Sequence, residues 1–468
     1  MMRPPDVPPP IWLETAPSFP GAPEMRRLFS TSAAATAALP ASRRTVFVDG
    51  VRIPFMLSGT AYTDLLAVDL ARLAVKGLLV KTAVDASKID YALLGTVIQE
   101  SRTSNIAREA VLSAGVPRTV PAHTITMACI SSNAAAASAT HLITAGAASR
   151  VLVGGVETMS DVPIRLSRPL RKRLLKAQKV KTTAGYLALL SGLKVADLAP
   201  EAPAIAEFST GEVMGASADR LAAAWGVSRA AQDAFALRSH VAAAAAHKAG
   251  LLKDEIVAVN GNAVDNTFKA DSTIEKLSSL KPAFVKPLGS VTAGNASALT
   301  DGASAALLMS EEAALRDGFV PRTIIADISV VACDPKEELL LGPAYAIAQL
   351  LARNKLGPSD VAVWELHEAF AGQVLANLAA LDSTVFAEKQ LGRGKGAAAV
   401  GIIPEERINT LGGSLALGHP FGATGVRLIT TASSRLVREN GRFAVVAACA
   451  AGGLGHAILL ERWVAPKA

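Results

Sequence analysis

Short aliphatic runs of strand length alternate with helix-length segments along most of this 468-residue chain. Residues 91–97 and 151–156 are such runs, and residues 64–76 carry apolar side chains at helical spacing. This alternation predicts parallel strands joined by crossover helices, because parallel neighbours need a long connection. Half of the residues are hydrophobic but only 4% are aromatic, so we expect an aliphatic core, which is typical of buried parallel strands.

The same order of features occurs twice. Cys129 precedes a helical segment of small residues and then a strand, and His419 precedes a second helical segment and a second strand. This repeat predicts two similar α/β halves. The match is weak at the level of single residues, so chance similarity between two βαβ units remains the alternative.

Composition also predicts the division of the chain. The first residues are rich in proline, and Arg26-Arg27-Leu28-Phe29 is followed by Ser and Ala, which is typical of a mitochondrial transit peptide. A plain disordered tail is the alternative. The predicted parts are the transit peptide or tail at 1–43, a first half at 44–157 with about 300–320, an inserted loop or lid domain at 158–299, and a second half at 321–468.

Three cysteines are too few for a disulfide framework, so we expect a reducing compartment. Cys129 lies between a strand-like run and an Ala-rich helical segment. A helix N-terminus favours the thiolate, which is the nucleophilic form. A buried structural cysteine is the alternative. Cys449 follows a strand and enters a loop of small residues, so it is a second candidate thiol.

Two histidines stand in unusual settings. His419 lies between Gly418 and Pro420 in a glycine-rich loop, where the backbone can approach a ligand closely and the imidazole can act as a base. The alternative interpretation of this loop is a surface turn that contains a histidine without a catalytic role. His367-Glu368 resembles the start of a zinc helix, but Ala371 occupies the position of the second histidine, so we predict no metal. Two thiols and a base predict acyl transfer through a thioester.

A set of motifs, in one order, resembles the thiolase family over nearly all of residues 44–465. The motifs are Cys129 with its neighbours, Gly294–Ala303, His367-Glu368-Ala369-Phe370, Gly418-His419-Pro420 and Cys449–Gly453. The resemblance implies the thiolase fold, in which two similar α/β halves with mixed sheets stack as five αβαβα layers, with an inserted loop domain. Most thiolases carry Asn where His367 stands. His367, together with Phe208-Ser209-Thr210 and the run Asp161-Val162-Pro163-Ile164-Arg165, makes this chain similar to the β subunits of the mitochondrial trifunctional enzyme of fatty-acid oxidation. Sterol-carrier-type thiolases also have His at this position, but a different pair of residues follows it.

The resemblance implies a 3-ketoacyl-CoA thiolase, which cleaves medium- or long-chain 3-ketoacyl-CoA with CoA into acetyl-CoA and a shortened acyl-CoA. It implies no cofactor other than CoA as a substrate. It also implies that Cys129 is the nucleophile, that His419 is the base and that Cys449 is a second acid/base. His367 would form one oxyanion site. The backbone N–H groups of Cys129 and Ala451 would form another. The residues that it implicates at CoA are Ser297, Met214, Phe284, Ala293 and Phe370.

Other functions remain as alternatives. An acetyl-CoA acetyltransferase or a sterol-carrier-type thiolase would differ in substrate, and sequence does not show the width of the acyl tunnel. Ketoacyl synthases do not need a second thiol, so Cys449 argues against them. Retention of all four reactive residues argues against a non-catalytic scaffold. The resemblance further implies a homodimer, a complex with the α subunit of a trifunctional enzyme, or both.

The formal net charge of +7 comes mainly from one segment. Residues 162–196 hold nine Lys and Arg and no acid, and the chain outside this segment and the first 44 residues is mildly acidic. Nucleic acid is therefore not predicted. Leucines accompany the cations, so we expect peripheral contact with an anionic membrane, on the matrix side of the mitochondrial inner membrane. A solvated basic face or a site for CoA phosphates is the alternative.

Overall fold

The structure is a computed structural model that describes residues 39–465. Most of the predicted transit peptide therefore falls on residues 1–38, outside the described residues. Within the described part, residues 40–43 form a turn, and the Arg43 guanidinium donates a hydrogen bond to the carbonyl oxygen of Thr144 (2.7 Å). Packing against the body of the protein thus begins a few residues before the first strand.

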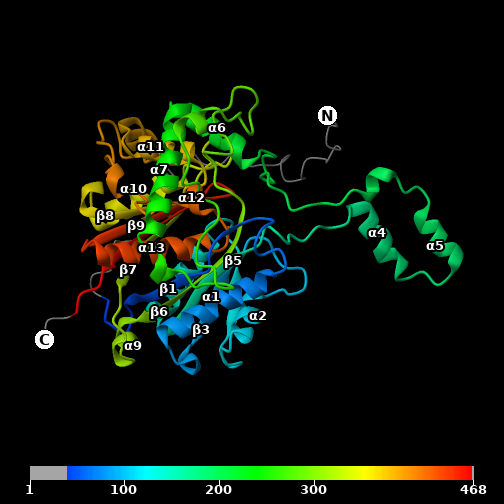
Figure 1. The fold of residues 1–468 in the computed structure, drawn as a ribbon, viewed down its shortest axis with the longest axis horizontal. Coiled ribbons are helices and arrows are strands. Elements are labelled where there is room, and N and C mark those ends of the chain that lie inside the picture. The colour runs from blue at the N-terminus through cyan, green and yellow to red at the C-terminus, as the bar shows by residue number, and fades with distance from the viewer. Residues whose placement is uncertain (1–38, 466–468) are drawn as a thin grey trace. The chain divides into compact units, whose positions relative to one another are not determined.

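Ten strands form one hydrogen-bonded series (Figure 1) in the order β4-β3-β5-β6-β1-β7-β10-β9-β8, with β2 paired to β6. Their bounds are β1 Thr45–Arg52, β2 Met56–Leu57, β3 Tyr91–Gly95, β4 Ala122–Ile125, β5 Arg150–Glu157, β6 Thr300–Ser310, β7 Thr323–Ala332, β8 Val361–Leu366, β9 Phe443–Ala450 and β10 Leu454–Arg462. β1 and β7 join the two halves through only two residue pairs, Val46–Ile324 and Phe47–Thr323.

Each half is a mixed sheet. In the first half β4, β3 and β5 are parallel and β6 and β1 are antiparallel. In the second half β8 and β9 are parallel, and β10 is antiparallel to both β9 and β7. The parallel strands carry the crossover helices, as the alternation in the sequence predicted.

Helices form three layers around the half-sheets. The helices are α1 Ala67–Thr82, α2 Ile106–Ser113, α3 Ser131–Ala145, α9 Glu311–Arg316, α10 Gly342–Asn354, α11 Ala371–Leu381, α12 Ser414–Leu417 and α13 Thr424–Arg438. α1 and α2 cover the outer face of the first half, and α10, with α11 packed on it, covers the second. α3 and α13 contact each other and lie between the halves, since α13 contacts β1 and β6 as well as β8 and β9. The predicted αβαβα layering is confirmed.

Small residues allow this central layer to be thin. A Cβ atom on Gly425 in α13 would lie 2.1 Å from the side-chain oxygen of Asn133 in α3. A Cβ atom on Gly155 in β5 would lie 1.9 Å from the carbonyl oxygen of Gly422. Such close approach of backbones is available only to glycine. The aliphatic, aromatic-poor composition therefore reflects two sheets held close to a shared pair of helices.

The segment between β5 and β6 contains α4 Arg168–Ala177, α5 Thr183–Leu190, α6 Met214–Ala224, α7 Arg229–Lys248 and α8 Ile274–Ser278. α6 and α7 pack on α11, and α7 also contacts α12, so this part of the segment covers the second half. α4 and α5 form a hairpin that stands apart from these layers (Figure 1). The exact domain boundaries remain a prediction. Within residues 39–465 we find no helix with the length and apolarity needed to cross a membrane.

Candidate active site

The four side chains that the sequence predicts to be reactive lie at the ends of core elements. Cys129 lies two residues before α3, and Cys449 is the penultimate residue of β9. His367 directly follows β8, and His419 lies in the loop between α12 and α13. Parallel strands and the helices that follow them place such loops at one edge of a sheet, which is where α/β proteins bind ligands.

Backbone hydrogen bonds hold the two histidine loops to neighbouring segments. The His367 N–H donates to the carbonyl oxygen of Ala447 in β9 (2.8 Å), two residues before Cys449. The His419 N–H donates to the carbonyl oxygen of Ala298 (3.2 Å), in the Asn/Ser/Ala-rich motif that the sequence singled out. Segments that are far apart in sequence therefore have a fixed register at this site.

Cys129 packs against the end of β9, at Ala448 and Ala450. The residue is partly exposed, but its thiol is surrounded by protein, and burial raises the pKa of the thiol to about 12. A hydrogen bond from the backbone N–H of Ala451 acts in the opposite direction. The expected position before a helix N-terminus is present, but burial has the largest effect on the pKa of Cys129 and favours the neutral thiol.

The two histidines lie against each other. The ring centroids of His367 and His419 are 4.0 Å apart, and both side chains are buried. Burial lowers the pKa of His419 to about 3, with the nearby positive charge of Arg427 adding to the effect. Burial, His419 and Arg427 together hold the pKa of His367 well below its usual value. Both imidazoles are therefore neutral at physiological pH, and within residues 39–465 neither Nε2 atom has a hydrogen-bond partner.

A neighbouring hydroxyl sets the tautomer of His419. The Thr424 hydroxyl donates to the carbonyl oxygen of Pro420 (3.0 Å). Its oxygen lies 2.7 Å from Nδ1 of His419, and with the hydroxyl hydrogen already used it accepts a hydrogen bond from that nitrogen. The proton of His419 is thus assigned to Nδ1, and Nε2 keeps its lone pair. This is the state required of a general base.

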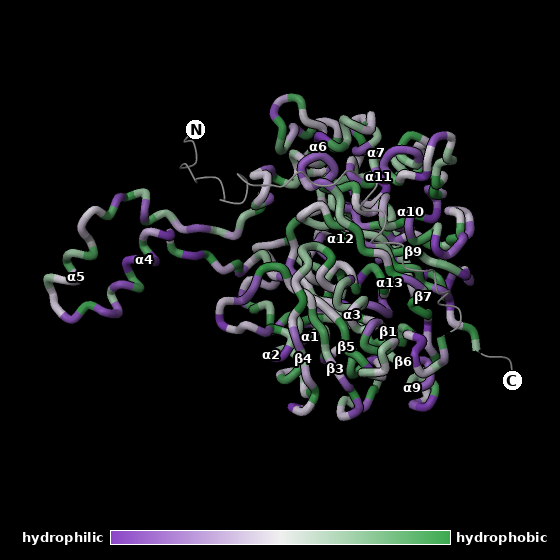
Figure 2. The backbone as a smooth tube through the Cα atoms, turned by 180° about the vertical axis from the view of Figure 1, so that it is seen from behind, coloured by the Kyte–Doolittle hydropathy of each residue, from purple (hydrophilic) through white to green (hydrophobic). Residues whose placement is uncertain are grey.

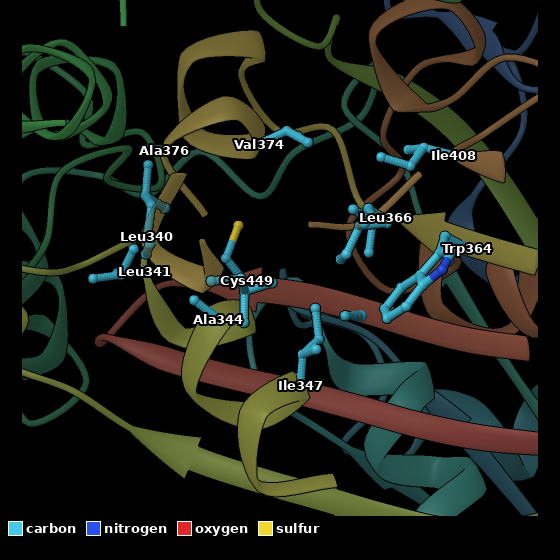
Figure 3. Close-up of a cluster of buried hydrophobic side chains, with 14 of the residues drawn as sticks. Leu340, Leu341, Ala344, Ile347, Trp364, Leu366, Val374, Ala376, Ile408 and Cys449 are labelled. Atoms are coloured by element: carbon cyan, nitrogen blue, oxygen red, sulfur yellow. The ribbon is translucent and has the colours of Figure 1, made fainter. Parts of the chain in front are cut away.

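Cys449 is almost fully buried. Figure 3 shows it beside α10 in a hydrophobic cluster that includes Ala344, Leu366 and Val374. Burial raises the pKa of the Cys449 thiol above its usual value, and the nearby Cys129 adds to the effect. Cys449 is therefore also protonated at rest, so it has a proton to give.

The residues implicated at CoA lie largely together. Met214 begins α6, and the next residue, Gly215, has no room for a Cβ atom because Phe284 packs over it. The rings of Phe284 and Phe370 meet edge to face, with centroids 6.2 Å apart. Ser297 is joined to the same loop, since its N–H donates to the carbonyl oxygen of Ala369 (2.9 Å). Ala293, four residues earlier, is exposed.

The sequence did not reveal Glu157. Its buried carboxylate accepts hydrogen bonds from the backbone N–H groups of Val97, Ile98 and Gly422, each at 3.0 Å. It therefore joins the loop after β3, the end of β5 and the His419 loop, and burial raises its pKa to about 7. The only signal was an acidic residue at the end of an otherwise apolar strand. Ser414, Thr424 and Arg427 were missed in the same way.

Comparison with known proteins decides the family. The family model described as "Thiolase, N-terminal domain" matches residues 45–312, and the model described as "Thiolase, C-terminal domain" matches residues 319–462. The chain belongs to the thiolase family. The predicted family, the thiolase fold and the acyltransferase class are thereby confirmed.

Several known proteins are similar to this chain along most of their length. The mitochondrial trifunctional enzyme subunit beta of Bos taurus is 51% identical over 92% of this chain and 91% of its own. A probable 3-ketoacyl-CoA thiolase of Caenorhabditis elegans is 52% identical over 93% of this chain and 98% of its own. The crystal structure of human mitochondrial 3-ketoacyl-CoA thiolase in complex with CoA covers 92% of this chain and 100% of its own, with a TM-score of 0.77 and 29% identity. The predicted similarity to the trifunctional β-subunit branch is confirmed.

Proposed function

We propose that this thiolase is a 3-ketoacyl-CoA thiolase of mitochondrial fatty-acid β-oxidation, which cleaves medium- or long-chain 3-ketoacyl-CoA with CoA as its second substrate. The observation that carries the proposal is the pair of neutral, buried imidazoles whose Nε2 atoms have no hydrogen-bond partner among residues 39–465. His367 is hydrogen-bonded to β9, the strand that carries the protonated thiol of Cys449 and against which Cys129 packs. The names of the mitochondrial relatives and the CoA-bound human thiolase support the same reaction.

In the first half-reaction, Nε2 of His419 takes the proton of the Cys129 thiol. The sulfur attacks the 3-keto carbonyl, and the C2–C3 bond then breaks to leave an acyl thioester on Cys129. Acetyl-CoA departs as its enolate, and the Cys449 thiol gives its proton to the C2 carbon. Both thiols begin protonated, which is what this sequence of transfers needs.

In the second half-reaction, the Cys449 thiolate takes the proton of the incoming CoA thiol. The CoA sulfur attacks the acyl carbonyl, and Cys129 leaves and recovers its proton from His419. The products are acetyl-CoA and an acyl-CoA shortened by two carbons, and both cysteines return to the thiol form. No cofactor is consumed.

Two groups of donors would stabilise the oxyanions. The Ala451 N–H already points at the Cys129 sulfur, so with the Cys129 N–H it suits the oxygen of the tetrahedral intermediate on that sulfur. His367 and protonated His419 would serve the enolate oxygen of acetyl-CoA. Ser297, Met214, Phe284, Ala293 and Phe370 would line the path of the pantetheine chain.

Chain length tests the substrate class. We expect kcat/KM for thiolysis of 3-ketohexadecanoyl-CoA to exceed that for acetoacetyl-CoA by about tenfold or more, because each buried methylene adds to binding. Thioester cleavage by the purified protein, with and without a candidate α subunit, would be followed by loss of substrate absorbance. A preference for acetoacetyl-CoA in both preparations would favour the acetyltransferase alternative.

We further propose a peripheral membrane contact through the α4–α5 hairpin. No residue of α4, Arg168–Ala177, is buried. Leu174, Leu175, Tyr186 and Leu187 are exposed, and Figure 2 shows the mainly hydrophilic α4 beside the more apolar α5. Exposed apolar side chains among cations are typical of a segment that lies on an anionic surface. The matrix face of the inner membrane would supply such a surface.

Not every cation of the hairpin is available to lipid. Arg171 forms an ion pair with Glu201 (2.6 Å), and Arg173 donates to the carbonyl oxygen of Ser191 (2.7 Å). These contacts of Arg171 and Arg173 stabilise the hairpin. Lys172, Lys176 and Lys179 form no ion pair within residues 39–465, so they are the better probes of membrane binding.

Replacing Lys172, Lys176 and Lys179 together with Gln should weaken binding to cardiolipin-containing vesicles roughly 100-fold, since each cation near an anionic surface contributes about 1 kcal/mol. Vesicle co-sedimentation measures the change. The matched control replaces the exposed Lys253, Lys281 and Lys389 with Gln and should bind as the parent does. Equal binding by all three proteins would contradict the proposal.

A further inference from the structure

A buried chain of polar groups ends on His367. Arg427, in α13, and Ser414, the first residue of α12, are both inaccessible to solvent. Nη2 of Arg427 donates a hydrogen bond to the Ser414 hydroxyl oxygen (2.9 Å). The same oxygen lies 2.8 Å from Nδ1 of His367. The chain thus runs from a permanent cation, through one hydroxyl, to the imidazole.

The direction of the last hydrogen bond follows from the first. A guanidinium has only donors, so the Ser414 oxygen accepts from Arg427 and its own hydrogen remains to be donated. Among the described residues, the only acceptor within reach of that hydrogen is Nδ1 of His367. The opposite arrangement would leave a buried hydroxyl hydrogen without an acceptor, which is unfavourable. Nδ1 therefore accepts, and the proton of His367 lies on Nε2.

The two neighbouring imidazoles are consequently in opposite tautomers. The Thr424 hydroxyl leaves His419 with a lone pair on Nε2, whereas Ser414 leaves His367 with a hydrogen on Nε2. Both Nε2 atoms are buried and unpartnered within residues 39–465. One is suited to accept a proton and the other to donate a hydrogen bond.

We propose that Ser414, held by Arg427, is a positioning residue that keeps His367 in the Nε2–H tautomer, so that His367 donates directly to the enolate oxygen of acetyl-CoA. This inference rests on the proposed function. It explains how a histidine serves at a position where most thiolases carry an amide. An asparagine always has an N–H to donate, but an imidazole has one at Nε2 only if its tautomer is fixed.

The surroundings of Arg427 fit this role. The Glu365 carboxylate lies 3.7 Å from Nη1 of Arg427 and 2.8 Å from Nη1 of Arg435, with all three side chains fully buried. The guanidinium is therefore held in place by an ion pair behind the site. Its charge also disfavours protonation of His367, which keeps the imidazole neutral while it donates.

The variant Ser414→Ala should lower kcat about 10- to 100-fold with KM changed less than threefold, because part of an oxyanion donor is lost. Ser414→Thr, which keeps the hydroxyl, should recover most of the rate. The matched control is Ser433→Ala, which removes another buried serine hydroxyl, bonded to Thr323 (2.9 Å) and away from the site, and should leave kcat unchanged. A parental kcat in Ser414→Ala would overturn the inference.

A double-mutant cycle separates positioning from simple structural damage. In a His367→Asn background there is no tautomer to fix, so Ser414→Ala should then cost less than twofold in kcat. A cost as large as in the parent would show that Ser414 does not act through His367. If the parent protein itself has no thiolase activity, the proposed function fails, whereas a normal parent with an unaffected Ser414→Ala variant removes only this inference.

The tautomer of His367 can also be determined without measuring enzyme activity. Nitrogen-15 NMR of histidine-labelled wild-type protein should show one imidazole, absent from His367→Asn, with Nε2 protonated and Nδ1 unprotonated. This measurement does not depend on the stability of any Ser414 variant. Protonation of Nδ1 in that residue, or an averaged signal from both tautomers, would overturn the proposal.

Discussion

Cys129→Ala should lower kcat for thiolysis by roughly 10⁴-fold or more, the scale seen when a covalent nucleophile is removed. This loss is expected because the acyl chain is held on the Cys129 sulfur between the two proposed half-reactions. The folded protein should survive the change, since Cys129 is partly exposed and only its thiol is lost. Steady-state thiolysis and the thermal unfolding midpoint of the same preparation measure the two effects.

Cys333→Ala is the matched control for this experiment. Cys333 is also a partly buried free cysteine, and its thiol contacts the carbonyl oxygens of Glu338 and Gly453, each at 3.1 Å. It has no role in the proposed reaction, so the variant should keep kcat within a few-fold of the parent. Equal loss of activity in both variants would mean that loss of a thiol disturbs the fold and would contradict the assignment of Cys129.

His419→Gln should lower kcat about 10²- to 10⁴-fold, which is the usual contribution of a general base. The remaining activity should rise about tenfold per pH unit from pH 7 to pH 10, because the pKa of Cys129 is raised to about 12 and only its thiolate reacts. The parent should not show this rise, since His419, with its pKa lowered to about 3, is neutral and ready to accept a proton throughout.

A matched variant isolates the base from histidine loss in general. His123 is exposed and contacts Tyr91, away from the reactive loops, so His123→Gln should behave as the parent does. Rate measurements over the stated pH range compare the three proteins. A His419→Gln variant whose rate is independent of pH would contradict the role of His419 as the base for Cys129.

The sequence predicted the fold, which is confirmed, and it predicted four candidate reactive residues, whose roles stay a prediction, because both leave local signals. Strand-length aliphatic runs and small-residue helices repeat along the chain, and each reactive residue lies in a distinctive loop at the end of such an element. Residues 91–97 and 151–156 were predicted as strands, and the structure places β3 at Tyr91–Gly95 and β5 at Arg150–Glu157. These signals need no knowledge of distant contacts.

What the sequence could not show depends on contacts between distant segments. Glu157 holds Gly422, 265 residues away, and nothing near either residue indicates the pairing. The partnership of Arg427 and Ser414 with His367 has the same character. Burial of Cys129 is a related case, because a helix N-terminus, which favours the thiolate, is visible in the sequence, whereas the burial that raises the pKa of the thiol is not.

The hairpin gives a further example. Composition identified the cations of residues 162–196 as one group, but the structure separates them by the contacts that they form. Arg171 and Arg173 hold the hairpin together, whereas Lys172 and Lys176 remain free of ion pairs among the described residues. A charge count finds the segment, and only the contacts show which of its charges a membrane could use.

The covalent attachment of the acyl chain to Cys129 can be tested directly by locating the acyl group. The wild-type protein would be incubated with 3-ketohexadecanoyl-CoA without free CoA, quenched in acid and digested, and the peptides analysed by mass spectrometry. We expect a tetradecanoyl thioester on the peptide that carries Cys129, and we expect it to disappear when CoA is added before the quench. An acyl group on Cys449, or turnover with no covalent adduct, would contradict it.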